Sequence, residues 1–331
     1  MTNMLLKNFM DSCTVASILQ TGSAAYIPVA IHEDSTVEEA LKMLSDNHIL
    51  SMPVYRHLAN PEYYAVIDML TIMRYILEVY TEEHIIENHG KLYHWSSWCT
   101  DITTLTKNGK EFCSCPVRTL LDRYDSSKFC PVPPTGNGVQ ILEVLSTGVH
   151  RCPVIDEKKS LAGILSQSTV NEYIARNISC LGEHLANRPV AEFGLTDRGN
   201  VVSISPDAFA IHAVHLMTTH NVSAVAVVQD HQLIGTVSST DLEGISQTHL
   251  GLLLCPVVDF LKRQQELLGQ KPASANLPPL TITPQTTIET AILKMAVTKV
   301  HRLWVVNEHG APVDVVSLTD LLRVLLENVQ G

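Results

Sequence analysis

Two short segments of the sequence each place an aspartate three residues after a serine. They run from Ser238 to Asp241 and from Ser317 to Asp320, and the second also contains Thr319. At the start of a helix this spacing forms a cap, because the two side chains bind backbone N–H groups that have no partner within the helix. The same features can bind a ligand, since free N–H groups attract phosphate and a carboxylate accepts hydrogen bonds from the vicinal hydroxyls of a ribose. The pattern therefore indicates either two helix caps or two ligand sites.

Two pairs of basic residues could bind the phosphate groups of such a ligand. They are His150-Arg151 and His301-Arg302. An arginine presents a rigid fork of donors that fits phosphate oxygens, and a histidine adds a donor whose charge depends on pH. A single pair on a surface is usually only hydrated, but two matching pairs in a chain with 23 Lys and Arg residues indicate an anion-binding role.

These motifs belong to one pattern that occurs four times along the chain. Its first phrase is apolar and β-branched and covers residues 49–54, 149–156, 221–228 and 300–308. Its second phrase follows in each copy and carries a hydroxyl residue, which is Thr71, Ser166, Ser238 or Ser317. The interval between the first two copies is the longest, which predicts an inserted segment between them.

Each copy has the same internal order of predicted elements. A short β-branched run comes first, at Tyr26–Ile31, Phe129–Val132, Val201–Ile204 and Leu280–Ile282. A helix follows, and capping-box spacing predicts its start at Ser35 and Glu38 in copy one and at Thr286 and Glu289 in copy four. Two apolar strands joined by a polar turn and a second helix complete a β-α-β-β-α unit. This alternation predicts an α/β fold with helices on the sheet faces.

The repeated unit resembles the cystathionine-β-synthase (CBS) domain, and four copies in one chain are similar to the γ regulatory subunit of AMP-activated protein kinase. The resemblance implies four tandem CBS repeats, at residues 1–80, 112–180, 189–248 and 252–331, with an insertion or linker at 81–111. It also implies that the repeats pair into two modules, 1–180 and 181–331. The modules would form a flat disk whose ligand clefts face a central pore.

The resemblance further implies that adenine nucleotides bind in these clefts. The His-Arg pairs would grip the phosphates, the Ser-x-x-Asp segments would hold the ribose, and strand backbone would contact the adenine. The ligand-contacting residues implied in this way are His150, Arg151, His301, Arg302, Thr71, Ser166, Val202, Val222, Ser223, Ala224, Ser238, Asp241, Ile282, Val300, Ser317, Thr319 and Asp320. The set includes no catalytic residue and no metal ligand.

Copies one, two and three each depart from the family pattern. Where the family has the ribose-binding aspartate, copy one has Arg74 and copy two has Thr169. An arginine donates hydrogen bonds and cannot accept them from ribose hydroxyls. In place of the His-Arg pair, copies one and three have Leu50-Ser51 and Asn221-Val222. We therefore expect at most two of the four clefts to be intact.

The composition excludes several classes of protein. The formal net charge of −11 argues against nucleic-acid binding, which needs a basic face. With 45% hydrophobic and 17% charged residues, the chain is predicted to be compact and globular. Its apolar runs are too short to span a bilayer, and its N-terminal residues do not resemble a secretory signal. Eight irregularly spaced cysteines indicate reduced thiols, so we expect a cytoplasmic or nuclear protein without a membrane partner.

The inserted region and the absence of catalytic motifs complete the prediction. The segment 81–127 carries His84, His89, His94, Trp95, Trp98, Cys99, Cys113 and Cys115. Their spacing fits no strong zinc pattern, so no metal is predicted. Trp95 and Trp98 either anchor a partner or cover a core edge. The motifs of P-loop proteins, zinc proteases and α/β-hydrolases do not occur, which predicts that the chain is not an enzyme.

Taken with the resemblance, these features predict an energy-sensing regulatory subunit that binds AMP, ADP and ATP as regulatory ligands. Its partners would be a protein kinase catalytic subunit and a scaffold subunit. Two alternatives remain open: a ligand-poor scaffold that binds a kinase or phosphatase, and a sensor of another adenosyl ligand such as S-adenosylmethionine. Loss of two ribose-binding acids favours the scaffold, whereas the two His-Arg pairs favour the nucleotide sensor.

Overall fold

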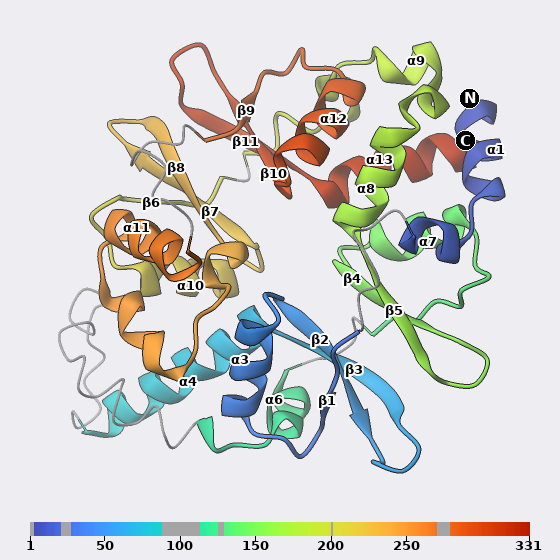
Figure 1. The fold of residues 1–331 in the computed structure, drawn as a ribbon. Helices are drawn as coiled ribbons and strands as arrows, with labels where there is room; N and C mark the ends of the chain where they lie inside the picture. The colour runs from blue at the N-terminus through green and yellow to red at the C-terminus, as the bar shows by residue number, and fades with distance from the viewer. Residues whose placement is uncertain (1–2, 21–27, 88–112, 125–128, 200, 270–278) are drawn as a thin grey trace. The chain divides into compact units, whose positions relative to one another are not determined.

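The chain forms two compact units, each assembled from separate stretches of sequence (Figure 1). The computed structural model describes residues 3–20, 28–87, 113–124, 129–199, 201–269 and 279–331. Unit 1 comprises Met1–Pro28, Ser127–Val201 and Leu280–Gly331, and unit 2 comprises Val29–Ser126 and Val202–Pro279. The units do not coincide with the expected division at residue 180: unit 1 contains the second and fourth repeats, and unit 2 contains the first and third.

Unit 2 has two three-stranded sheets, each flanked by helices. The first repeat contributes β1 (Ile31–His32), α3 (Val37–Asp46), β2 (Ser51–Arg56), β3 (Glu62–Asp68), α4 (Met69–Glu87) and α6 (Val117–Arg123). The third contributes β6 (Ser203–Ile204), α10 (Ala210–Thr219), β7 (Ala224–Gln229), β8 (Gln232–Ser238), the 3-10 helices η4 (Ser239–Leu242) and η5 (Gln247–Leu254), and α11 (Val257–Leu267). In each sheet the first strand is parallel and the third antiparallel to the middle strand.

Unit 1 has the same architecture. Its elements from the N-terminal stretch and the second repeat are α1 (Met4–Ser12), α2 (Val15–Leu19), α7 (Gly138–Leu145), β4 (Arg151–Ile155), β5 (Leu161–Ser166), α8 (Gln167–Arg176), η2 (Ile178–Leu181), α9 (Gly182–Ala186) and η3 (Val190–Phe193). The fourth repeat adds β9 (Thr281–Ile282), α12 (Ile288–Thr298), β10 (Arg302–Val306), β11 (Pro312–Ser317) and α13 (Leu318–Gln330). In the second repeat a single parallel bridge between Val132 and Val154 stands where the others have a first strand.

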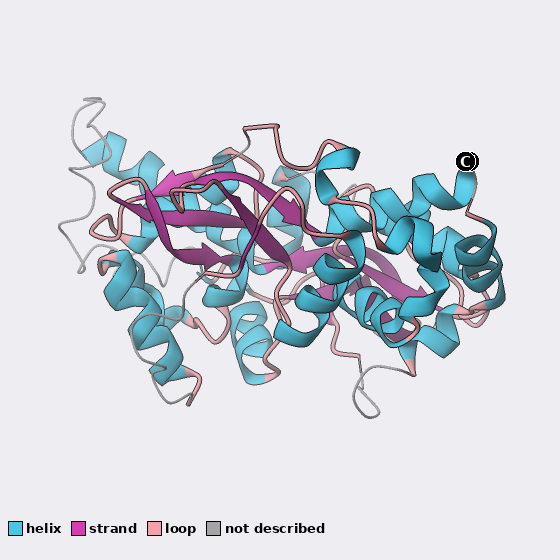
Figure 2. Cartoon of the chain, turned by 90° about the horizontal axis from the view of Figure 1, so that it is seen from above, coloured by secondary structure: helices cyan, strands magenta, loops and turns pink. Residues whose placement is uncertain are grey.

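Helix packing explains why the units pair alternate repeats. Each unit has its own hydrophobic core, to which both of its repeats contribute. In unit 2, α4 packs on α10; in unit 1, α8 packs on α12 and α7 on α13. Figure 2 shows helices lying beside the strands. Burial of amphipathic helix faces is the main stabilising term in such a layer arrangement. The predicted α/β fold of repeated CBS-like units is confirmed.

One hydrogen bond recurs in all four repeats and fixes their equivalence. The first residue of the last helix donates its N–H to the carbonyl just before the middle strand, as in Met69 to Leu50, Gln167 to His150, Ser239 to Ser223 and Leu318 to His301. This register makes Asp68, and not Thr71, the equivalent of Ser166. Asp68 caps α4 by accepting a hydrogen bond from the Thr71 N–H at 2.7 Å. The prediction that Arg74 is the first-repeat equivalent of Asp320 is therefore wrong. That equivalent is Thr71, three residues after Asp68.

Helix starts differ from the prediction by one residue. The capping box of α3 consists of Thr36 and Glu39, with both reciprocal hydrogen bonds present. In α12, Thr287 is the N-cap and accepts from the Thr290 N–H at 3.2 Å. The last helix of the third repeat is also shorter than predicted, because only the four-residue η4 follows β8.

A short segment just before each repeat, called its leader here, pairs with the neighbouring repeat, which the sequence did not reveal. The leaders contain Thr14, Pro116, Pro189 and Pro256, in the order of the repeats. Bridges join Thr14 to Asn137, Pro116 to Thr36, Pro189 to Thr287 and Pro256 to Phe209. The leader of repeat one thus pairs with repeat two and the leader of repeat two with repeat one. Repeats three and four exchange their leaders in the same way.

Part of the inserted region lies outside the described residues. His89, His94, Trp95, Trp98 and Cys99 fall there, while His84 belongs to α4. Cys113 is fully buried and Cys115 partly buried, beside α6. Among the described residues, no group of His, Cys, Asp and Glu could hold a metal ion.

Candidate functional site

The two His-Arg pairs come together within unit 1. Arg151 begins β4 and Arg302 begins β10, and each pairs across its ladder with the serine that caps the following helix, Ser166 or Ser317. The arginines therefore stand beside the starts of α8 and α13, where unpaired N–H groups also favour an anion.

The pKa of His301 is shifted by the residues of this cluster. Its pKa is lowered from 6.5 to about 4, first by burial and then by the positive charges of Arg302, Arg151 and His150. All four residues thus share one electrostatic environment, although the two pairs lie far apart in the sequence. Cations held close together repel one another, and an anion bound among them would relieve this repulsion.

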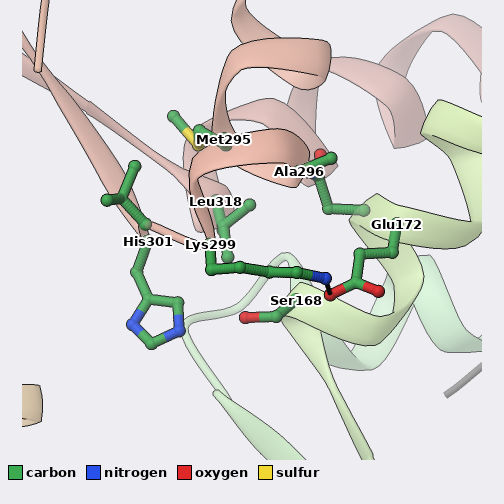
Figure 3. Close-up of a pocket in the computed structure, with 9 residues that line it drawn as sticks. Ser168, Glu172, Met295, Ala296, Lys299, His301 and Leu318 are labelled. Carbon is green, nitrogen blue, oxygen red and sulfur yellow. Dashed lines mark hydrogen bonds and ion pairs between the residues drawn. The ribbon is translucent and has the colours of Figure 1, made fainter. Parts of the chain in front are cut away.

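A pocket of about 180 Å³ opens next to His301 (Figure 3). It lies between α8 and the end of α12 and is lined by Ser168, Asn171, Glu172, Met295, Ala296, Lys299, Val300, His301 and Leu318. Lys299 extends across it to form an ion pair with Glu172 (Figure 3). Asn171 is buried and donates to the Ile292 carbonyl at 3.1 Å, which holds α8 against α12. The lining thus includes an amine, an imidazole and a hydroxyl, together with the Glu172 carboxylate that already pairs with the amine.

Lys299 occupies a backbone position that does not suit it. It caps the end of α12 in the left-handed region, with φ 58°. The equivalent residues of the other repeats are His48, Gly148 and Asn221, all with positive φ. Glycine and asparagine tolerate this conformation better than lysine does. The fourth repeat thus places a long cation where the chain turns into the His-Arg pair, and the sequence pattern did not single it out.

Ser317 and Asp320 form the predicted cap. Asp320 Oδ2 accepts from the Ser317 N–H at 2.8 Å and from the Ser317 hydroxyl at 2.6 Å, while Ser317 Oγ accepts from the Asp320 N–H at 3.2 Å. The other oxygen, Oδ1, accepts from Arg198 Nη1 at 2.8 Å. Both carboxylate oxygens of Asp320 are therefore engaged within the protein.

Thr319 lies beside the second repeat. Its hydroxyl accepts a hydrogen bond from the buried amide of Gln167 at 2.8 Å, and the same amide donates to the Leu145 carbonyl at 2.9 Å. Gln167 begins α8 and Thr319 is the second residue of α13, so the starts of these two helices are adjacent. This contact explains how the two His-Arg pairs meet.

The third-repeat residues gather at one end of their sheet in unit 2. Asp241 Oδ2 accepts from the Ser238 N–H at 2.7 Å and from its hydroxyl at 2.8 Å. Ala224 pairs with Ser238, and the Val202 carbonyl accepts from the Ala226 N–H at 2.9 Å. Because η4 is only four residues long, this end lacks the N-terminus of a regular helix.

The register corrects two further assignments and supports a third. Ser223-Ala224, and not Asn221-Val222, is the third-repeat equivalent of the His-Arg pairs. Val222 is equivalent to Val300, as predicted from their shared place before the middle strand. The predicted match of Ile282 with Val202 is wrong. In the third repeat the Val202 carbonyl accepts from the Ala226 N–H, and in the fourth the Leu280 carbonyl accepts from the equivalent Trp304 N–H. Leu280 is therefore the equivalent of Val202. Ile282 is buried in the core of unit 1 instead.

In the first two repeats a threonine stands three residues after the cap. Thr71 follows Asp68, and Thr169 follows Ser166, with the Ser166 and Thr169 hydroxyls 2.8 Å apart. Arg74 is exposed and forms an ion pair with Glu78 at 3.0 Å. A threonine can accept a hydrogen bond but lacks the two charged acceptors of an aspartate.

Comparison of the sequence with known proteins finds a matching domain family and several relatives. The CBS domain family model matches residues 26–78, 190–244 and 275–327. Protein SDS23 of Yarrowia lipolytica is 29% identical over 340 residues, covering 90% of this chain and 64% of that protein. Protein SDS23 of Candida albicans is 25% identical over 301 residues, covering 84% and 46%. The chain thus spans between about half and two thirds of the length of these relatives.

The fold also has a solved counterpart. A Methanocaldococcus jannaschii protein, described as a proposed archaeal homologue of γ-AMPK, superposes with a TM-score of 0.64 at 14% identity, over 92% of this chain and 98% of that one. None of the described helices is long and apolar enough to cross a membrane. Three segments of the chain therefore match the CBS domain family, and the shared hydrogen-bond register gives the second repeat the same architecture.

Proposed function

We propose that this chain is a regulatory protein that binds adenine nucleotides at the His-Arg cluster of unit 1. The observation that carries the proposal is the convergence of His150, Arg151, His301 and Arg302 beside a pocket and two adjacent helix starts. A net charge of −11 makes this local gathering of cations unusual for the chain as a whole. Phosphate is the anion that arginine forks and helix N-termini bind together.

The adenine and ribose of the proposed ligand follow from the family resemblance. The resemblance to γ-AMPK, shared by the description of the archaeal structure, supports AMP, ADP or ATP as the ligand. Asp241 and Asp320 are the two acids at the ribose position. A ligand would act by linkage: if it prefers one arrangement of the repeats, a bound kinase catalytic subunit and scaffold subunit would sense a coupling of about 1–3 kcal/mol.

A second candidate function has its own supporting observation. Both oxygens of Asp320 already have protein partners, and repeats one and two have threonine at that position. A chain in which the ribose sites are closed would serve as a ligand-poor scaffold for a kinase or phosphatase. The nucleotide sensor remains the better supported function, because a scaffold gives no reason for the clustered cations.

Calorimetric titration of the full chain distinguishes the two candidates and the remaining adenosyl ligand. AMP, ADP, ATP, S-adenosylmethionine and GMP would be titrated separately, each with a parallel melting curve. The sensor should bind AMP or ADP more tightly than GMP, and should melt at a higher temperature with them because binding stabilises the folded state. No binding of any adenine nucleotide at millimolar concentration would contradict the proposal and leave the scaffold.

A further inference from the structure

We propose that Arg198 is a latch that occupies Asp320 and keeps the adenosine part of a ligand out of the fourth repeat until it is displaced. This inference rests on the proposed function, in which the ribose binds Asp320. It adds a residue that neither the repeat pattern nor the family resemblance indicated.

The latch contact is direct. Arg198 Nη1 donates to Asp320 Oδ1 at 2.8 Å, and the carboxylate is almost completely buried, with a side-chain exposure of 10%. Asp320 Oδ2 is held by Ser317. A ribose that binds through its two hydroxyls needs these same oxygens, and it offers neutral donors in place of a charged guanidinium. Both donors would form charge-assisted hydrogen bonds with the carboxylate, but the guanidinium adds the attraction of an ion pair at a nearly buried acid. Arg198 therefore holds Asp320 unless phosphate binding favours the nucleotide.

A second acid holds the latch in place. Asp314 on β11 has a side-chain exposure of 0% and accepts from Arg198 Nη2 at 3.1 Å and from the Arg198 backbone N–H at 2.6 Å. The guanidinium also donates to the Val315 carbonyl. A fully buried carboxylate needs a cation or several donors. Arg198 therefore has a resting position that does not depend on Asp320, and it can release Asp320 while keeping its contact with Asp314.

The position of Arg198 in the chain gives the latch a regulatory consequence. It lies in the segment 194–199 that follows η3, three residues before unit 1 ends at Val201 and unit 2 begins at Val202. A ligand that displaces Arg198 from Asp320 would loosen this connector. This is one of the four places where the chain passes from one unit to the other, so a partner that contacts the connector would sense binding in the fourth repeat.

The latch is tested by comparing AMP binding in Arg198→Gln with binding in the unmodified full chain. Glutamine can still donate to Asp314 but cannot bridge to Asp320 with a charge. Arg188→Gln is the matched control, because Arg188 lies on the same stretch and pairs with Glu192 at 2.8 Å. A double variant, Arg198→Ala with Asp314→Asn, removes the buried charge along with its partner in case the glutamine variant does not fold.

The latch predicts that Arg198→Gln binds AMP at least tenfold more tightly, or binds one additional AMP per chain, while Arg188→Gln matches the unmodified protein. Adding Asp320→Asn to Arg198→Gln should abolish the gain. Unchanged or weaker AMP binding in both Arg198 variants overturns the latch. If the unmodified chain binds AMP and the variants bind no better, the latch alone fails. If no variant binds any adenine nucleotide, the proposed function fails and the latch falls with it.

Tryptic cleavage after Arg198 gives a second readout that does not depend on affinity. Trypsin must take the arginine side chain into its own pocket, which the ion pairs with Asp314 and Asp320 oppose. Saturating AMP should accelerate cleavage after Arg198 and leave cleavage after Lys159, in the exposed turn between β4 and β5, unchanged. Equal rates after Arg198 with and without bound AMP would contradict displacement of the latch.

Discussion

The amide of Gln167 donates a hydrogen bond to the hydroxyl of Thr319 at 2.8 Å, across 152 positions of sequence. This bond joins the start of the last helix in repeat two to the start of the last helix in repeat four. Because each of these helices follows a strand that pairs with a His-Arg strand, the contact also brings the two basic pairs into one cluster. The proposed phosphate site therefore depends on packing between distant repeats and not on a local motif.

Replacing Gln167 with leucine should destabilise unit 1. Its amide is buried and makes two hydrogen bonds, so removal leaves the Leu145 carbonyl without this donor. Loss of a buried partner costs about 1–3 kcal/mol in the free energy of unfolding. Urea denaturation measures the change, and the exposed Gln330→Ala, which removes a contact to Glu143, should alter stability by less than about 0.5 kcal/mol. A leucine variant as stable as the unmodified chain would show that the amide bonds contribute nothing.

Acid should destabilise the chain through His301. Its pKa is about 4 in the folded protein and 6.5 in the unfolded chain, so the unfolded state binds more protons between these values. The free energy of unfolding should therefore rise with pH from about 4 to 6.5, with His301 contributing up to about 3 kcal/mol. His301→Gln should flatten this dependence in urea denaturation at pH 5 and pH 7. His215 has a similarly lowered pKa and is present in both proteins, so the difference between them isolates His301. An equally steep pH dependence in the variant would rule out this role.

The corrected register of repeat one can be tested with two alanine substitutions. Asp68 caps α4, so Asp68→Ala should lower the free energy of unfolding by about 0.5–2 kcal/mol. Arg74 is exposed and pairs only with Glu78 and the Tyr124 ring among its described contacts, so Arg74→Ala should leave nucleotide affinity unchanged. Thermal melts and AMP titration of both variants would check this. An Asp68→Ala variant as stable as the unmodified chain would contradict the corrected register.

The exchanged leaders predict a long-range effect of a mutation near the N-terminus. Ile18 is fully buried in the core of unit 1, which contains repeat two and not repeat one. Ile18→Ala should cost about 2–5 kcal/mol and should reduce amide-exchange protection in β4 and β5. Protection in β2 and β3 of repeat one should change far less. The opposite pattern would mean that the leader stabilises its own repeat.

Local features of the fold were predictable from the sequence. The order of strands and helices followed from apolar periodicity and cap residues, and the Ser317 cap was read correctly because all its partners lie within three residues. The sequence pattern aligns Thr71 with the capping serines of the other repeats, because it requires a hydroxyl residue at that position. The actual cap is Asp68, since aspartate caps helices as well as serine does. Thr71, only three residues later, supplied the hydroxyl that the pattern required.

Features that depend on distant contacts were not predictable. Arg198 stands alone in a polar stretch, and only the folded chain shows that Asp314 and Asp320 lie around it. The exchange of leaders likewise joins segments such as Thr14 and Asn137 that share no local signal. Lys299 was missed because positive φ is a property of the backbone, which a single lysine does not reveal.

The central claim, that clustered His-Arg pairs bind nucleotide phosphate, is tested most directly by titrating AMP and adenosine into the unmodified chain and Arg302→Ala. Arg263→Ala, which removes an exposed arginine on α11 in unit 2, serves as the control. AMP affinity should fall at least tenfold in Arg302→Ala, equivalent to about 1.4 kcal/mol, while adenosine affinity stays the same because adenosine has no phosphate. An equal change in both affinities, or no change in either, would contradict the phosphate role of the cluster.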